Sequence, residues 1–392
     1  MLRLGRRMAL TSTLHAGLKY ETGMNTLCVY SWAIIWKAFP RLPAEEGDGV
    51  QAMTIGIALV GLGMARKPHM QSLSELGHRM RIVACHAPSA ARREAFAGAH
   101  PDLPLAADLD VVLGDPNVDA VFLLTPPMTH ADLVARCAAA GKHVLLEKPL
   151  DVTVARGRQS VELMERAGLR FGVVLQHRFR DASRKLAAIL QSGELGELIS
   201  ASASIRWWRP PEYYAQPGRG MKGRDGGGVL LTQAIHTLDL FQSLTGPVKR
   251  VAAFAKTSPL RSIDTEDIAA AAVEFGNGAI GTIDATTVSF PGFTEKIELA
   301  CEKGTAVLEA ESLAVFHQDG RVIRHEGAES RAGGVDPMAF SHDAHKRVII
   351  DFLDAIEQGR EPAVSGREAL KVQVLIEALL ASSQTGKALT LT

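Results

Sequence analysis

Residues 54–63 read TIGIALVGLG, an apolar run that ends in two glycines separated by one residue. A short continuous run of apolar residues predicts a strand that is buried on both faces, as in a parallel sheet. Gly61 permits a tight turn, and Gly63 allows the backbone to approach a pyrophosphate at the start of the following helix. This order of strand, glycine turn and helix predicts a dinucleotide-binding site.

The chain after this turn alternates between strands and helices. Strand-like runs lie at 81–85, 120–124 and 143–147, and apolar residues with helical spacing lie at 67–76, 90–97 and 130–140. This alternation predicts a parallel sheet that is covered on both faces, with its ligand at the carboxyl ends of the strands. Residues 53–175 are therefore expected to form one dinucleotide-binding domain.

The end of the second expected strand lacks the carboxylate that ordinarily holds the ribose 2′-hydroxyl of NAD. His86 occupies that position, and no acidic residue occurs between Glu75 and Glu94. Arg92 follows closely, and a basic group there would attract a 2′-phosphate. The sequence therefore favours NADP over NAD, although Arg92 and Arg93 could instead belong to a solvated helix face.

Composition excludes several classes of protein. The 392 residues are 46% hydrophobic and 22% charged, with 43 basic and 43 acidic side chains. This length suggests two or three domains of roughly 150 residues each. Zero net charge argues against a protein that mainly binds nucleic acid or a membrane surface. The four cysteines (Cys28, Cys85, Cys137 and Cys301) lie far apart, which excludes the usual zinc motifs and favours a reducing, cytoplasmic location.

Residues 1–52 differ from the rest of the chain. Their longest apolar run, at 27–39, contains Lys37 and is shorter than the roughly 20 apolar residues of a transmembrane helix. Residues 40–49 read PRLPAEEGDG, which is typical of a linker. We expect residues 1–52 to be a dispensable, disordered extension, with Met53 as an alternative translation start. A targeting or anchoring segment is the other interpretation.

Several further motifs follow the glycine turn. They are His69, TPPMTH at 125–130, GKHVLLEKP at 141–149, QHRF at 176–179, GELG at 193–196, and GGG at 226–228 followed by His236. Together they resemble the Gfo/Idh/MocA oxidoreductases, which are named after glucose–fructose oxidoreductase, inositol dehydrogenase and a rhizopine catabolism protein. The resemblance covers about residues 53–392.

The resemblance implies an α/β fold in two parts. An N-terminal Rossmann dinucleotide-binding domain (53–175) would be followed by an α/β domain with a large open mixed β-sheet (176–392), and this open sheet commonly forms dimers or tetramers. Strand-like stretches in the second half fit this expectation. They lie at 198–207, 248–257, 268–275, 279–287, 296–301 and 304–309.

The resemblance also implies a function. The protein would transfer a hydride between NAD(P) and a secondary alcohol or carbonyl of a sugar, inositol, polyol or sugar acid. A non-catalytic regulatory protein that binds the cofactor, and a trans-dihydrodiol dehydrogenase, are the alternatives. The cofactor-binding candidates are Gly61, Gly63, Met64, Ala65, His86, Arg92, Thr125, Pro126, His130, Glu147 and Lys148.

Lys148 is the expected proton-transfer residue, because the resemblance places it where the substrate hydroxyl meets the nicotinamide. A lysine is a poor base at its free pKa of about 10.4, but burial and a cationic neighbour lower that pKa. Within EKP, Glu147 is expected to hydrogen-bond nearby.

His236 is the second catalytic candidate, on a helix expected over 229–244. The family often carries an aspartate four residues before this histidine, whereas Thr232 stands there in this chain. A hydroxyl cannot replace a carboxylate as a proton acceptor, so this site departs from a Lys–Asp–His relay. Gln233 could add a hydrogen bond, and Asp239 could orient the imidazole.

Residues 206–214 (RWWRPPEYY) and the loop at 218–224 (GRGMKGR) lie just before the GGG motif. Aromatic rings could stack on a sugar, and Arg219, Lys222 or Arg224 could bind a carboxylate through a bidentate fork. A neutral sugar or inositol is the first expectation and an acidic sugar the second. Alternatively, the rings pack at a subunit interface and the arginines are solvated.

The candidate substrate-binding residues are Lys148, Arg178, Trp208, Arg219, Arg224, Thr232, Gln233 and His236. No metal is expected, because the sequence indicates no third ligand to join His342 and His345. The expected partners are a small-molecule substrate and further copies of this chain.

Overall fold

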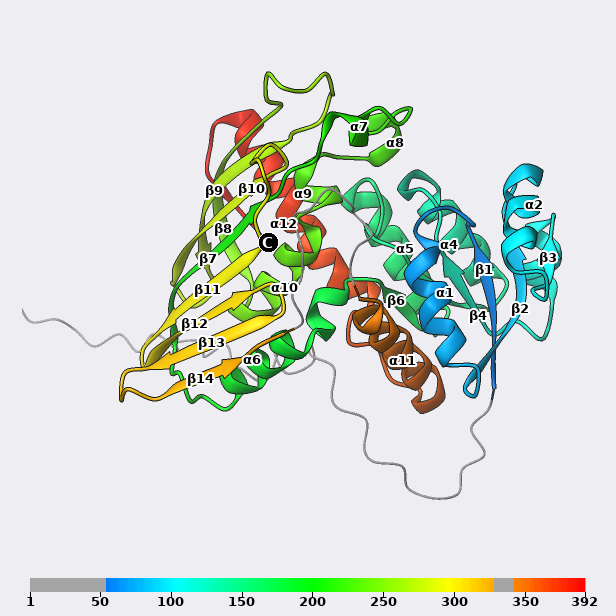
Figure 1. Ribbon diagram of the computed structural model, residues 1–392, viewed down its shortest axis with the longest axis horizontal. Coiled ribbons are helices and arrows are strands. Elements are labelled where there is room, and N and C mark those ends of the chain that lie inside the picture. Colours follow the sequence, from blue (N-terminus) through cyan, green and yellow to red (C-terminus); the bar gives the residue numbers. More distant parts are fainter. Residues whose placement is uncertain (1–53, 328–340, 392) are drawn as a thin grey trace, which may run out of the picture.

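The computed structural model describes residues 54–327 and 341–391, so the expectations for residues 1–52 lie outside the described residues. The described chain forms two bodies, one built on a six-stranded sheet and the other on a nine-stranded sheet. Figure 1 shows them side by side, with the two C-terminal helices between them.

The first body is a doubly wound parallel sheet with the strand order β3-β2-β1-β4-β5-β6. Its strands are β1 (Ile55–Val60), β2 (Met80–His86), β3 (Leu105–Ala106), β4 (Ala120–Leu123), β5 (His143–Leu146) and β6 (Phe171–Val173). Its helices are α1 (Arg66–Glu75), α2 (Ala90–Ala99), α3 (Leu109–Gly114), α4 (His130–Ala139) and α5 (Val154–Arg166). All of β1 is buried, as its apolar run predicts. The order of strands reverses between β1 and β4, which is where such sheets bind ligands.

The second body is a mixed sheet with the order β14-β13-β12-β11-β7-β10-β9-β8-β15. Its strands are β7 (Leu198–Arg206), β8 (Val248–Lys256), β9 (Ile268–Phe275), β10 (Ile280–Thr286), β11 (Lys296–Cys301), β12 (Gly304–Glu309), β13 (Ser312–His317), β14 (Val322–His325) and β15 (Leu389–Thr390). Only the β7–β10 pair is parallel among these described strands. The expected large mixed sheet is therefore confirmed.

Helices cover one face of this sheet, and the other face is open among the described residues. The covering helices are α6 (Asp181–Gln191), α10 (Ile235–Thr245) and α12 (Gly366–Thr385), which contact β12, β7 and β8 respectively. Burial alternates residue by residue along β11, because one side of the strand packs on these helices and the other does not.

The C-terminal helices connect the two bodies. Helix α11 (Asp343–Gln358) packs on α1, and Arg79, just before β2, forms ion pairs with Asp354 and Glu357 of α11 at 2.8 and 2.6 Å. Helix α12 contacts both α5 and β8. The second half of the chain thus supplies helices to both bodies.

The helix expected over 229–244 is interrupted. It forms α9 (Val229–Thr232) and α10, with Gln233 at φ −110° between them. The expectation of one continuous helix is therefore wrong, and the interruption turns the Thr232 carbonyl away from a helical partner.

A buried ion pair fixes α10 in place. Arg178, in the short 3-10 helix at Gln176–Phe179, donates from Nε and Nη2 to the two carboxylate oxygens of Asp239 at 2.7 and 2.6 Å. The two side chains are only 2% and 1% exposed. Asp239 therefore pairs with Arg178 and does not orient His236. Arg178 is accordingly a structural residue of the second body.

We expect Asp239→Ala to lower the free energy of unfolding by about 3–5 kcal/mol, because it leaves a buried guanidinium without its main partner. Urea unfolding followed by circular dichroism would measure this loss. Asp284→Ala, which breaks the exposed pair with Arg206, should cost no more than about 1 kcal/mol. Similar losses in both variants would contradict this assignment.

Candidate active site

A cavity of about 1740 Å³ lies between the two bodies and is lined by residues of both. The glycine turn and the ends of β2, β4 and β5 line one side, and residues between 207 and 236 line the other. Pockets for a single small ligand measure roughly 300–1,000 Å³, so this cavity has room for a dinucleotide and a second molecule.

The glycine turn forms the start of the cavity wall, as expected. Gly61 has φ +106°, and a Cβ there would lie 2.6 Å from the backbone of Leu124, so only glycine fits. Gly63, Met64 and Ala65 also line the cavity. Open space surrounds the Cβ position of Gly63.

Arg66 occupies the third position of the glycine fingerprint and braces the turn. Its Nη1 donates to the carbonyl oxygens of Leu62 and Gly63, both at 2.9 Å, and its guanidinium lies over the ring of Phe96. This departure from the glycine pattern therefore supports the turn from outside the cavity.

His86 and Arg92 line the cavity at the end of β2, as expected. The ring of His86 hydrogen-bonds through Nδ1 with the carbonyl of Ala106 at 3.1 Å. Asp108 lines the same end and was missed by sequence reasoning. It follows β3, which has only two residues and gives almost no periodic signal.

Thr125 and Pro126 line the cavity, whereas His130 lies behind its wall. The His130 ring contacts the carbonyl oxygens of Pro149 and Thr125 at 2.9 and 3.0 Å. Burial lowers the pKa of His130, which favours the neutral ring. The expectation that His130 binds the cofactor directly is not supported, because its ring holds the backbone of the EKP segment.

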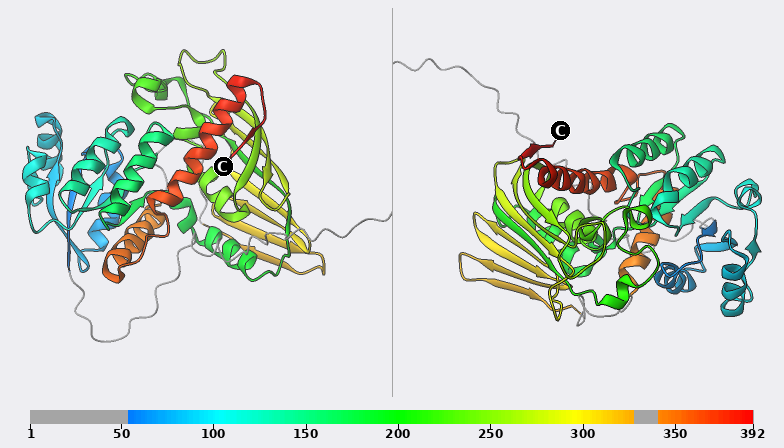
Figure 2. Two further views of the ribbon diagram at one scale, coloured as in Figure 1. Left: turned by 180° about the vertical axis from the view of Figure 1, so that it is seen from behind. Right: turned by 90° about the horizontal axis from the view of Figure 1, so that it is seen from above.

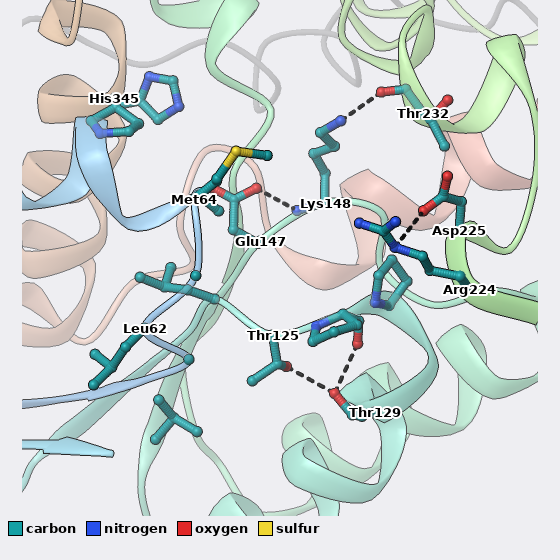
Figure 3. A pocket seen from close by; sticks show the side chains of 18 of the residues that line it. Leu62, Met64, Thr125, Thr129, Glu147, Lys148, Arg224, Asp225, Thr232 and His345 are labelled. Atoms are coloured by element: carbon teal, nitrogen blue, oxygen red, sulfur yellow. Dashed lines mark hydrogen bonds and ion pairs between the residues drawn. The ribbon is translucent and has the colours of Figure 1, made fainter. Parts of the chain in front are cut away.

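Lys148 reaches across the cavity toward the second body (Figure 3). Its Nζ donates to the carbonyl oxygen of Thr232 at 2.6 Å, and its backbone N–H donates to Glu147 Oε2 at 3.1 Å. Burial lowers the pKa of Lys148; the nearby Glu147 opposes this shift, while Arg219 and Arg209 add to it. A neutral amine that donates one N–H to Thr232 keeps its lone pair for a substrate proton.

His236 lines the cavity beside Lys148 and stacks on a second histidine. The rings of His236 and His177 lie 5.1 Å apart, and His177 also lines the cavity. Burial lowers the pKa of both rings well below 6.5, so both are neutral at physiological pH. His236 Nδ1 has no hydrogen-bond partner among the described residues. Sequence reasoning missed His177, although it stands in the QHRF motif.

Thr232 and Gln233 line the cavity at the helix interruption. The Thr232 hydroxyl donates to the carbonyl of Gly228 at 2.7 Å, and Gln233 Nε2 donates to the hydroxyl of Tyr213 at 3.1 Å. These contacts orient Gln233 and Thr232, the residue that stands where the family often has an aspartate.

Arg219 and Arg224 line the cavity, as expected, together with Arg209, which sequence reasoning missed. The tryptophan that lines it is Trp207. Trp208 instead packs its ring edge on Phe290, at 5.6 Å between centroids, and takes part in a bridge with Val288. The expectations that Trp208 and the buried Arg178 contact substrate are therefore wrong.

Three potential metal ligands meet beside the cavity. Ligand atoms of His69, Glu147 and His345 lie within 4.8 Å of one another, although no metal was expected from the sequence. His69 Nε2 and Glu147 Oε1 already form a hydrogen bond at 2.7 Å. Burial raises the pKa of Glu147, but the contacts with His69 outweigh it and keep the carboxylate ionised. Burial lowers the pKa of His345 to about 3. The absence of a metal stays a prediction.

No helix among residues 54–327 and 341–391 combines the length and the apolar character that a membrane span requires.

Comparisons with known proteins match both bodies. A family model described as an oxidoreductase family with an NAD-binding Rossmann fold matches residues 55–175, and the Gfo/Idh/MocA C-terminal domain matches residues 183–307. The chain is 27% identical to the inositol 2-dehydrogenase of Rhizobium meliloti over 341 residues, which cover 84% of this chain and 97% of that protein. It is 26% identical to the D-apiose dehydrogenase of Paraburkholderia graminis, over 85% of this chain and 89% of that protein.

Solved structures share this architecture. The WlbA dehydrogenase from Bordetella pertussis, in complex with NADH and UDP-GlcNAcA, is 28% identical with a TM-score of 0.73, covering 86% of this chain and 99% of that chain. A levoglucosan dehydrogenase in complex with NADH and levoglucosan has a TM-score of 0.75 at 21% identity, over 86% of this chain and 99% of that chain, and supports the fold alone. The chain therefore belongs to the Gfo/Idh/MocA family of oxidoreductases, and it is an NAD(P)-dependent dehydrogenase.

Proposed function

We propose that this protein interconverts a secondary alcohol and a carbonyl on a sugar or polyol, with Lys148 as the group that exchanges the hydroxyl proton. The observation that carries the proposal is the buried Lys148 amine, which faces a cavity large enough for a dinucleotide and a substrate. Relatives named inositol 2-dehydrogenase and D-apiose dehydrogenase support the substrate class.

The nicotinamide, when bound, accepts or returns a hydride. In the direction of oxidation, the substrate O–H proton passes to the lone pair of Lys148 Nζ as the carbon-bound hydrogen leaves as a hydride. The Thr232 carbonyl holds the amine in place through its 2.6 Å hydrogen bond. The neutral ring of His236 orients the substrate hydroxyl by a hydrogen bond from the second body. The proton therefore goes to Lys148, and the hydride goes to the nicotinamide.

Lys148→Met should reduce turnover by about 10²–10⁴-fold, because it removes a positioned acid–base group but keeps the side-chain volume. In the wild type, the rate of oxidation should rise with pH through a lysine pKa below 10.5, since only the neutral amine accepts a proton. Absorbance of the reduced nicotinamide, across a panel of aldoses, inositols, uronates and dihydrodiols, measures both effects.

Cofactor affinity should change less than threefold in Lys148→Met, as measured by fluorescence titration. Lys185→Met, which changes an exposed lysine on α6, should leave turnover unchanged. Near-normal activity in Lys148→Met would contradict the assignment.

We propose a preference for NADP, supported by His86 and Arg92 at the end of β2. Asp108 lines the same end and would favour NAD if its carboxylate reached the ribose. The structural relatives named above hold NADH. The cofactor choice therefore depends on which of these side chains meets the 2′ position.

His86→Asp should shift the ratio of kcat/KM for NADP over NAD at least about tenfold toward NAD, because a new carboxylate repels the 2′-phosphate and accepts from a 2′-hydroxyl. Asp108→Ala should move the same ratio in the opposite direction. Steady-state kinetics with both cofactors measure the ratio. An unchanged ratio in His86→Asp would place His86 away from the ribose.

We also propose a homodimer or homotetramer that forms through the open face of the nine-stranded sheet. Large apolar side chains are exposed on these strands, including Phe254 on β8 and Ile280 on β10, which are 73% and 66% exposed. A second copy of this chain would cover them. We also propose a cytoplasmic location, because the three cysteines among the described residues are free and buried.

Ile280→Lys should shift the assembly toward the monomer, because it places a charge in the covered face. Sedimentation velocity at micromolar concentration would measure the mass of the wild type and the variant. Lys185→Met should sediment like the wild type. A wild type that is monomeric at this concentration would overturn the proposed assembly.

A further inference from the structure

Two polar side chains of the cavity wall come from the same end of the nine-stranded sheet. Trp207 directly follows β7, and Glu295 directly precedes β11. Strands β7 and β11 are neighbours in this sheet, which Figure 2 shows from behind and from above. Both side chains line the same cavity as Lys148, so this end of the sheet forms part of the wall opposite the glycine turn.

Backbone pairing on both sides fixes the position of Glu295. The ladder between β7 and β11 reaches Lys296, and beyond it the N–H of Phe293 donates to the carbonyl of Arg206 at 2.9 Å. Glu295 lies between these two contacts, and Trp207 follows Arg206. The segments that carry the two side chains are therefore held against each other.

Each side chain has one buried polar atom that lacks a hydrogen-bond partner among the described residues. In Trp207 this atom is the indole Nε1, and in Glu295 it is Oε2. An indole N–H only donates and a carboxylate oxygen only accepts, so no change of tautomer or amide orientation can satisfy them. A buried polar group without a partner is unfavourable, and both residues line the cavity. The cavity is therefore where we expect their partners to bind.

The other carboxylate oxygen of Glu295 is occupied. Oε1 accepts from Arg180 Nη1 at 2.7 Å, and Arg180 Nε lies 3.7 Å from Glu311 Oε1. One guanidinium thus faces two carboxylates, and all three side chains line the cavity. Because like charges repel, this part of the wall disfavours an anionic ligand group.

We propose that Trp207 and Glu295 form a hydroxyl-recognition subsite, in which the indole N–H donates to, and Glu295 Oε2 accepts from, hydroxyl groups of the substrate that do not react. An ammonium group cannot accept from the indole, and a carboxylate cannot donate to Glu295. A hydroxyl does both, so one hydroxyl or a neighbouring pair satisfies the two atoms. This assignment rests on the proposed dehydrogenase function, and it narrows the substrate class to molecules that carry neutral hydroxyls at this end of the cavity.

Equilibrium binding tests the subsite without turnover. The Lys148→Met protein, saturated with cofactor, would be titrated by calorimetry with glucose, galactose and myo-inositol, and with the monodeoxy analogues of each. For at least one of these three parent compounds, removal of one particular hydroxyl should weaken binding by about tenfold or more. The loss is expected because the analogue leaves a buried carboxylate oxygen or indole N–H unpaired.

Conservative variants locate the contact. Glu295→Gln keeps an oxygen for Arg180 but replaces the free acceptor by an NH₂ donor, and Trp207→Phe keeps a ring but loses the N–H. Each should weaken binding of the parent compound by about tenfold, and binding of the analogue that lacks the recognised hydroxyl by less than about threefold. Glu309→Gln changes an exposed carboxylate on β12, and Trp208→Phe changes a tryptophan that does not line the cavity. Neither control should change either affinity.

Equal losses for the parent compound and every deoxy analogue would reveal a merely structural role and would overturn the assignment. Unchanged affinity in either Glu295→Gln or Trp207→Phe would also overturn it, as would the absence of binding by all three parent compounds.

The proposed function fails separately. In that case one hydroxyl would be recognised through Glu295 and Trp207, yet the wild type would not oxidise or reduce any member of the substrate panel. Turnover of a panel member whose affinity depends on neither side chain would overturn the subsite and leave the proposed function standing.

Discussion

The hydrogen bond from Lys148 Nζ to the carbonyl oxygen of Thr232 crosses the cavity and joins its two walls. In an uninterrupted helix, a carbonyl accepts from the amide four residues later. Helix α9 ends at Thr232, and the last carbonyls of a helix lack intrahelical partners. The interruption at Gln233 therefore makes an acceptor available to the lysine. The position of the amine depends on this one break in the second body.

The cavity is lined by two kinds of basic side chain, those that can lose their charge by titration and those that cannot. Burial lowers the pKa of Lys148, His177 and His236, which favours the neutral forms of these side chains. Arg209 and Arg219 keep their charge whatever the pH. Holding the lysine and histidines neutral also reduces repulsion among five basic side chains that share one space. Acid–base chemistry and fixed charge can thus coexist in the same cavity.

Local patterns in the sequence located the first sheet and much of its ligand-binding edge. The run at β1, the turn at Gly61 and the EKP segment are each encoded within a few residues, and the structure places them as expected. Partners that are distant in the chain were not predictable in this way. Arg178 and Asp239 are 61 residues apart, and only the packed fold shows that they pair with each other.

Other errors arose from small shifts in geometry. Trp207 and Trp208 directly follow β7, and only Trp207 lines the cavity, so composition could not tell which one faces it. The break at Gln233 has no glycine or proline to mark it. Asp108 follows a two-residue strand, below the length at which periodicity is informative. Each case depends on tertiary packing rather than on local propensity.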